Sequence, residues 1–178
     1  ESALMEVRQL AAKISTPVNY LEGVAAPIGP LPGNILCFAR HGVADLLKPA
    51  SRRRTQHHRC VFLVSLHGSG RVCLDSESFL IQQGQAQLIF PFQFHSYLEV
   101  QPDDICWVFI TFESFVLDAI APLRSSPSRT LGPTEILLLR ELIQCWLEKD
   151  RQQELIPLYL GLLLGRLGKM GPRPKRSA

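Results

Sequence analysis

The central part of the sequence, residues 34–113, alternates short apolar runs with turn signals. The segments between the runs, at 68–70, 75–77, 83–84 and 101–104, carry Gly, Pro, Asp and Ser, and we expect a hairpin turn at Gly68-Ser69-Gly70. Short strands at regular spacing are typical of a β-sandwich or barrel. The apolar runs are Asn34–Ala39, Arg59–Leu66, Arg71–Leu74, Phe79–Gln82, Gln87–Phe90, Ser96–Val100 and Ile105–Phe112.

Two leucine-rich segments follow, at Thr134–Lys149 and Glu154–Leu167, and both show helical periodicity. The second is apolar nearly all round, so it needs packing partners on more than one side. The barrel supplies one partner, and we predict that a second copy of the chain supplies the other. The alternative is that both helices cover the barrel of a monomer. The residues predicted to form the homodimer contact are Leu139, Leu142, Trp146, Tyr159, Leu160 and Leu163.

Composition divides the chain into four segments. Residues 1–33 hold an amphipathic helix, expected over Ser2–Ser15, and a Pro/Gly-rich arm at Pro17–Gly33. The barrel is expected over residues 34–121 and the helical dimerisation segment over 122–168. Residues 169–178 are basic and form the predicted linker or tail.

Charge and cysteine content exclude several classes of protein. The formal net charge is only +3, which argues against a protein that coats nucleic acid. The 5 cysteines are widely spaced and include no C-x-x-C, as expected of reduced, buried thiols in a cytoplasmic protein. The longest apolar run, Leu158–Leu164, is far shorter than the roughly 20 residues of a membrane span, so we expect no membrane partner.

One stretch carries a resemblance to a known family. His58–Tyr97 contains a strand ending in G-x-G, then Gly84, an apolar strand ending in Phe-Pro, and His95. This order resembles the cupin double-stranded β-helix. More closely, it resembles the N-terminal sensor domain of the AraC/XylS family of bacterial transcription regulators, as does the Trp-containing run Cys106–Phe112. The resemblance covers about Asn34–Leu167. It implies a jelly-roll barrel followed by two antiparallel helices, a mainly β fold with α.

Most cupin enzymes hold a metal through two motifs, and this sequence departs from both. In the register set by the glycines, the ligand positions fall on Arg54, Gln56, Val61 and His95. Arginine, glutamine and valine are not ordinary metal ligands. We therefore expect no metal and no cofactor.

The same register predicts a ligand-binding set. If residues 54 and 56 point into the barrel, strand alternation adds His58. Arg54, Gln56, His58 and His95 would then orient a small molecule, with Trp107 stacking on it, and an inward arginine favours an anionic or sugar-like ligand. Each residue also has a plainer interpretation: Arg54 in a solvated loop, His95 bonded to the backbone, and Trp107 packed in the core.

The sequence contains no G-x-S-x-G, no phosphate-binding glycine loop and no paired carboxylates in the β region, so we assign no catalytic residue and expect no enzyme. The resemblance implies a ligand-sensing and dimerisation domain. Its small-molecule effector would bind in a metal-free barrel, and the arm would respond to it. DNA would be contacted only through a domain not present in this chain.

Two alternatives stay open. One is a metal-dependent cupin enzyme, either an isomerase or an oxygenase. The other is a barrel without a ligand that only dimerises, with its interior filled by Phe62, Phe90, Phe92 and Phe94.

Overall fold

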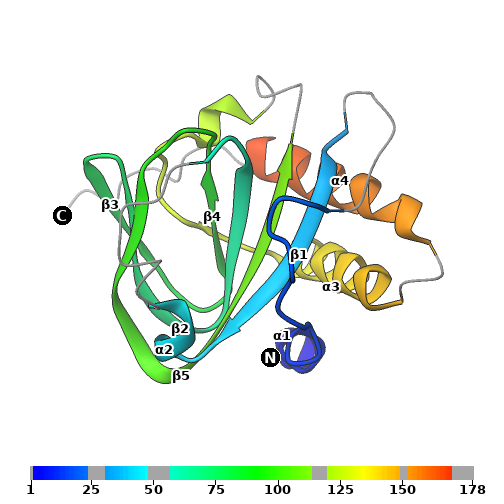
Figure 1. The fold of residues 1–178 in the computed structure, drawn as a ribbon, viewed down its shortest axis with the longest axis horizontal. Coiled ribbons are helices and arrows are strands. Elements are labelled where there is room, and N and C mark those ends of the chain that lie inside the picture. Colours follow the sequence, from blue (N-terminus) through cyan, green and yellow to red (C-terminus); the bar gives the residue numbers. More distant parts are fainter. Residues whose placement is uncertain (1, 24–30, 48–56, 114–119, 149–151, 170–178) are drawn as a thin grey trace.

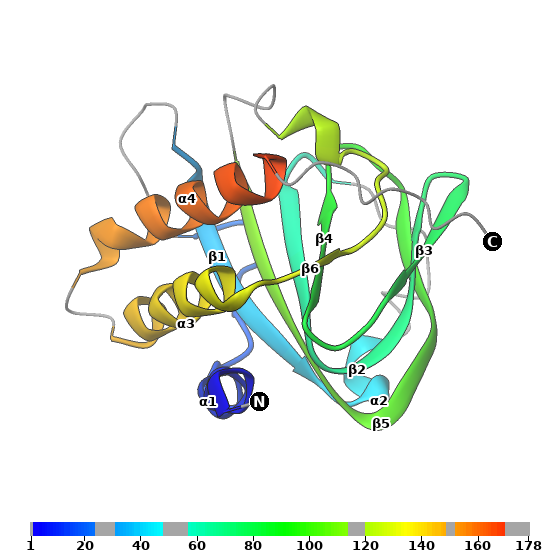
Figure 2. The same cartoon turned by 180° about the vertical axis from the view of Figure 1, so that it is seen from behind.

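The computed structural model describes residues 2–23, 31–47, 57–113, 120–148 and 152–169. A strongly curled antiparallel sheet forms a barrel, and a layer of helices covers one of its sides (Figures 1 and 2). This confirms the expected fold class. The helices are α1 (Ser2–Ala11), α2 (Val43–Leu46), α3 (Pro133–Leu147) and α4 (Ile156–Lys169), with short 3-10 turns at Ala121–Leu123 and Gln153–Leu155. The strands are β1 (Gly33–His41), β2 (Cys60–Leu74), β3 (Glu77–Ile81), β4 (Gln85–Ile89), β5 (His95–Glu113) and β6 (Arg129–Thr130).

The two longest strands, β2 and β5, form the spine of the sheet. The strand order is β1-β5-β2-β4-β6, and β3 pairs with β2 beyond this path. The β2–β5 ladder runs from Cys60 opposite Phe112 to Leu74 opposite His95. Both long strands run from one end of the barrel to the other, and the sheet curls around one interior (Figure 1).

The predicted turns at 68–70 and 101–104 are wrong: both segments lie inside these long strands. Gly68 has a φ of +86°, which favours glycine, and a Cβ there would meet the Gln101 carbonyl oxygen at 2.8 Å and Ile105 Cγ2 at 2.6 Å. The register of the ladder shifts on both sides of this point. The glycine therefore serves a bend of β2 against β5, and the hairpin turn lies at Asp75–Ser76 instead.

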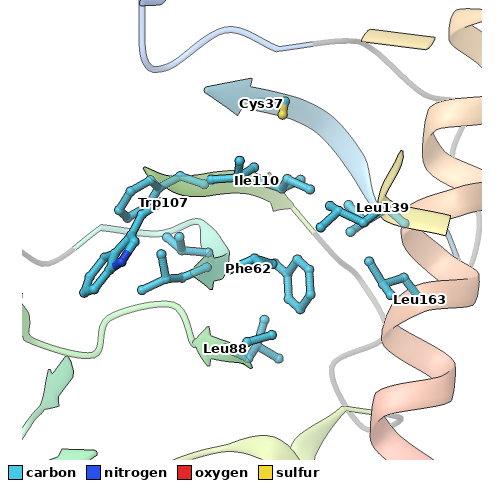
Figure 3. Close-up of a cluster of buried hydrophobic side chains, with 14 of the residues drawn as sticks. Cys37, Phe62, Leu88, Trp107, Ile110, Leu139 and Leu163 are labelled. Atoms are coloured by element: carbon cyan, nitrogen blue, oxygen red, sulfur yellow. The ribbon is translucent and has the colours of Figure 1, made fainter. Parts of the chain in front are cut away.

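Alternation along the strands separates two faces. Phe62 lies opposite Ile110 on β5 and Leu88 on β4, and Figure 3 shows these side chains directed toward Leu139 and Leu163 of the helices. Helices α3 and α4 run antiparallel across this outer face of the barrel, and α1 lies along α3 (Figures 1 and 2). One hydrophobic core spans the segments predicted as 34–121 and 122–168, together with α1.

A buried carboxylate joins the two C-terminal helices. Glu135 accepts a hydrogen bond from the Gly132 backbone N–H at 2.9 Å, at the start of α3. Its other oxygen accepts one from Arg166 Nε of α4 at 2.5 Å. Glu135 is buried, so this pair holds α3 and α4 together as one unit.

The burial of these helices corrects the predicted dimer contact. Leu139, Leu142, Leu160 and Leu163 are at most 1% exposed in a single chain, because they pack against the barrel. They are not available to a partner. Trp146 and Tyr159 are partly buried against the same core. The leucines that do face outward are Leu137, Leu158 and Leu162, each about half exposed.

All five cysteines are free thiols, four of them buried. Within the described ranges, no helix combines the length and apolar character that crossing a membrane requires.

Candidate functional site

A cavity of about 450 Å³ opens inside the barrel. This volume is within the usual range for a small-molecule site, roughly 300–1,000 Å³. Its walls come from β1, β2, β5 and α2, from the segment before β2, and from the arm. The lining residues are Tyr20, Leu21, Phe38, Arg40, Asp45, Leu46, His57, His58, Arg59, Val61, His95, Tyr97, Phe109 and Thr111.

Strand register explains why these side chains converge. Phe38 of β1 lies opposite Phe109 of β5, and Val61 of β2 lies opposite Thr111 of β5. Their neighbours in sequence point to the helical face, because successive side chains alternate across a strand. The cavity is therefore lined by one face of the same three strands whose other face packs against α3 and α4.

Aromatic rings form much of the wall. The rings of Phe38 and Phe109 are stacked, with centroids 5.2 Å apart and planes only 5° from parallel. Tyr97 meets Phe109 edge to face at 5.9 Å, and Tyr20 of the arm meets Phe38 in the same way at 5.2 Å. These pairings hold the wall in a fixed shape.

Two histidines lie side by side at the cavity. The ring centroids of His57 and His95 are 5.1 Å apart. Burial lowers the pKa of His95 to about 4, and burial is also the main cause that lowers the pKa of His57. Both imidazoles are therefore neutral near pH 7. Among the residues that the structure describes, the buried His57 Nδ1 has no hydrogen-bond partner.

Arg59 is a buried cation that sequence reasoning missed. Its Nε donates to Thr111 Oγ1 at 3.1 Å, and its Nη2 donates to the backbone carbonyl oxygens of Thr111 and Asn34. Glu113 lies 3.4 Å from its Nη1. One sequence signal could have found it: Arg59 stands at the start of an apolar run, two residues before Val61, so the two side chains are expected on the same face. Arg59 joins β1, β2 and β5 at one end of the cavity.

Arg40 occupies the mouth of the cavity beside the arm. Its guanidinium lies over the rings of Phe38 and Tyr20, 5.1 and 5.6 Å from the centroids, and donates to the Tyr20 hydroxyl at 2.9 Å. Asp45 of α2 is 3.7 Å from Arg40 Nη1. The arm is thereby attached to the barrel at the entrance of the site.

The predicted ligand-binding residues have different positions. Arg54 and Gln56 lie outside the described residues. His58 is on the rim, half exposed, with Nε2 3.4 Å from Glu113. His95 lines the cavity, and its Nδ1 also lies 3.3 Å from the Gln93 carbonyl oxygen. Trp107 is fully buried beneath Tyr97, at a centroid distance of 5.9 Å, and does not line the cavity, which agrees with its plainer interpretation as core.

The barrel filled by phenylalanines is contradicted. Phe62 points to the helices, and Phe92 and Phe94 are 64% and 42% exposed, so they do not fill the interior. The metal alternative finds no ligand set in the described ranges, where no three His, Cys, Asp or Glu side chains lie close enough to hold an ion. Arg59 and Thr111 also line the cavity, but they do not supply a set of metal ligands.

The arm also reaches the helical layer. Gly23 donates its backbone N–H to Asn34 Oδ1 at 2.7 Å, and a Cβ on Gly23 would collide with the Ile35 carbonyl oxygen at 2.3 Å. Further along, Leu31 and Pro32 lie against Gly161 of α4. The described parts of the arm therefore contact the cavity, β1 and α4 in turn.

Comparison with known proteins gave structural matches only. No family model matches the chain, and no curated protein matches it. Solved structures with a similar arrangement include AraC-like regulators and cupin-domain proteins. An apo ToxT variant from Vibrio cholerae aligns over 80% of this chain and 55% of its own, with a TM-score of 0.49 and 9% identity. The AraC-like transcriptional activator CuxR aligns over 81% and 51%, with a TM-score of 0.46 and 13% identity.

The cupin domain of Schizosaccharomyces pombe Cnp3 aligns over 52% of this chain and 62% of its own, with a TM-score of 0.35 and 12% identity. The chain thus spans about half the length of the two regulators.

Proposed function

We propose that this chain is a ligand-sensing module: a small molecule binds in the barrel cavity, and the module passes the signal to a DNA-binding domain outside these residues. The main support for this proposal is the cavity of about 450 Å³, whose wall includes Tyr20 and Leu21 of the arm. A ligand in contact with the arm can bind one position of the arm more tightly than another, and such a difference in affinity is what any shift between two conformations requires.

The path from the cavity to the helices supports signal transfer. The arm lines the cavity at Tyr20 and contacts α4 at Leu31, and α4 is fixed to α3 by the Glu135–Arg166 pair. A ligand that displaces Tyr20 acts on a segment with its other contact on the helical layer. We also propose that the chain forms a homodimer through the outer surface of the helical layer, with Leu158 and Leu162 in the contact.

Binding without catalysis suits the chemistry of the walls. The acidic and basic side chains that the structure describes at the cavity are paired, Arg59 with Glu113 and Arg40 with Asp45. The two imidazoles are neutral and the remaining walls are mostly aromatic or aliphatic. The class of DNA-binding regulator comes from the sequence resemblance to the AraC/XylS sensor domain.

A parallel thermal-shift screen of small metabolites tests the proposal. Wild type is compared with Val61→Trp, which places a large ring in the cavity, and with Leu80→Trp, a matched change at a half-exposed position on β3. We expect a class of compounds that stabilises wild type and Leu80→Trp but not Val61→Trp. Compounds that stabilise all three equally, or none that stabilises wild type, contradict the proposal.

A further inference from the structure

We propose that the cavity selects an uncharged aromatic molecule, in preference to an anion or a sugar. This inference rests on the proposed function and names the ligand class of the same site. It departs from the anionic or sugar-like ligand that an inward Arg54 suggested. The described walls of the cavity favour this class of ligand through their rings, their charges and their capacity for hydrogen bonds.

The rings favour a flat partner. The rings of Phe38 and Phe109 are nearly parallel and stacked, and both line the cavity. Tyr97 and Tyr20 add further ring surface to its wall. Aromatic pairs gain binding energy beyond the burial of their area when they meet edge to face or offset. A planar aromatic molecule can use this gain, and a saturated molecule of equal size cannot.

The charges disfavour an ion. Arg59 is only 3% exposed and already donates to Thr111 and the Asn34 carbonyl beside Glu113, so it offers little to an incoming anion. Arg40 is shared between Asp45, the Tyr20 hydroxyl and two ring faces. An anion would have to break these pairings, and a buried ion without a partner is costly. A cationic ligand is disfavoured for the same reason, because the lining carboxylate of Asp45 is already paired with Arg40.

The polar inventory disfavours a sugar. A sugar carries several hydroxyl groups, and each one that is buried without a hydrogen-bond partner weakens binding. Phe38, Phe109, Val61 and Leu46 supply no hydrogen bonds, and Thr111 is already an acceptor for Arg59. Among the described residues His57 Nδ1 has no partner, so it offers a hydrogen bond to one polar atom of a ligand. An aromatic molecule with one or two polar atoms leaves far fewer groups unpaired.

Calorimetric titration at pH 7 with matched probes tests the ligand class. The probes are 2-naphthol, its saturated analogue decahydro-2-naphthol, the anion 2-naphthoate, and D-arabinose. We expect 2-naphthol to bind with a Kd below about 1 mM, and at least tenfold more tightly than each of the other three probes, a difference of about 1.4 kcal/mol. Absence of binding by 2-naphthol, or equal or tighter binding by any other probe, overturns the inference.

A pair of variants locates the binding. Phe109→Leu removes a ring from the cavity wall, while Phe112→Leu removes a buried ring from the opposite face of the same strand. Circular dichroism first confirms that both variants are folded. We expect Phe109→Leu to weaken 2-naphthol binding about tenfold and Phe112→Leu to leave it within twofold. Equal effects of the two variants overturn the inference.

The two failures are distinguishable. If 2-naphthoate or D-arabinose binds more tightly, and Val61→Trp abolishes that binding, the ligand class is wrong and the sensing function stands. If no probe and no metabolite in the screen binds wild type, the proposed function itself fails.

Discussion

Leu31 of the arm packs against Gly161 of α4 so closely that a Cβ at Gly161 would lie 2.9 Å from Leu31 Cδ2. At the next glycine of the helix, Gly165, no atom of the described residues lies within 4 Å of the corresponding position. Gly161 therefore accommodates the arm, the same segment that walls the cavity at Tyr20.

The two glycines make a matched pair for stability measurements. Glycine in a helix interior costs about 1 kcal/mol relative to alanine. We expect Gly165→Ala to raise the free energy of unfolding by about that amount, and Gly161→Ala to raise it clearly less, because Leu31 must move. Urea unfolding measures both. An equal gain at both positions would show that the arm does not press on α4.

Buried Arg59 is expected to be a major determinant of stability. Arg59→Met removes the donor to Thr111 Oγ1 and to two backbone carbonyl oxygens, and it removes the buried cation beside Glu113, so it should lower the free energy of unfolding by about 2–4 kcal/mol. Arg71→Met, in β2, removes an exposed ion pair with Glu99 and should cost less than about 1 kcal/mol. Denaturant titrations of both variants check the difference. Similar losses would mean that Arg59 is not the tie between strands described above.

Stability should fall in mild acid because of His95. Its pKa is about 4 in the folded chain and near 6.5 when unfolded, so below pH 6.5 the unfolded state takes up a proton that the folded state refuses. Between pH 7 and 5 this lowers the free energy of unfolding by about 2 kcal/mol, and His57 acts in the same direction.

The variant His95→Gln should flatten this dependence, while His67→Gln, at a partly exposed ring outside the cavity, should keep it. Unfolding is followed at pH 7, 6 and 5. A slope in His95→Gln equal to that of wild type would exclude His95 as its source.

The homodimer, if it uses the helical layer, must use the outward leucines. We expect Leu158→Glu combined with Leu162→Glu to give a folded monomer, because both side chains are about half exposed. Leu160→Glu should instead unfold the chain, because it buries a charge in the core. Sedimentation and circular dichroism separate the two results. A wild-type chain that is monomeric at micromolar concentration would remove the dimer from the account.

Sequence periodicity was sufficient for α1, α3, α4 and most strands, but not for the short helix α2 or for the bends. Leucine spacing predicts the bounds of α3 and α4 to within about two residues, because the apolar residues on the buried face of a helix recur at the helical period. The glycines at 68 and 70 carry the signature of a hairpin, yet they bend a single strand, because the partner that fits against Gly68 is Gln101, far away in sequence.

The cavity was harder to predict for the same reason. Phe38, Arg40 and Phe109 converge through the pairing of β1 with β5, which single-strand patterns do not reveal. His95 was found because a family motif contains it. The dimer leucines were misassigned because a helix apolar on all sides can be satisfied by a curved barrel on one side and neighbouring helices on another.

The most direct test of the central claim is amide hydrogen exchange, with and without the tightest ligand from the screen. If the ligand occupies the barrel and contacts the arm, exchange at residues 18–23 should slow at least fivefold, and the β3 hairpin, which does not line the cavity, should be unchanged. A ligand that binds but leaves exchange at residues 18–23 as fast as in the free chain would contradict the account.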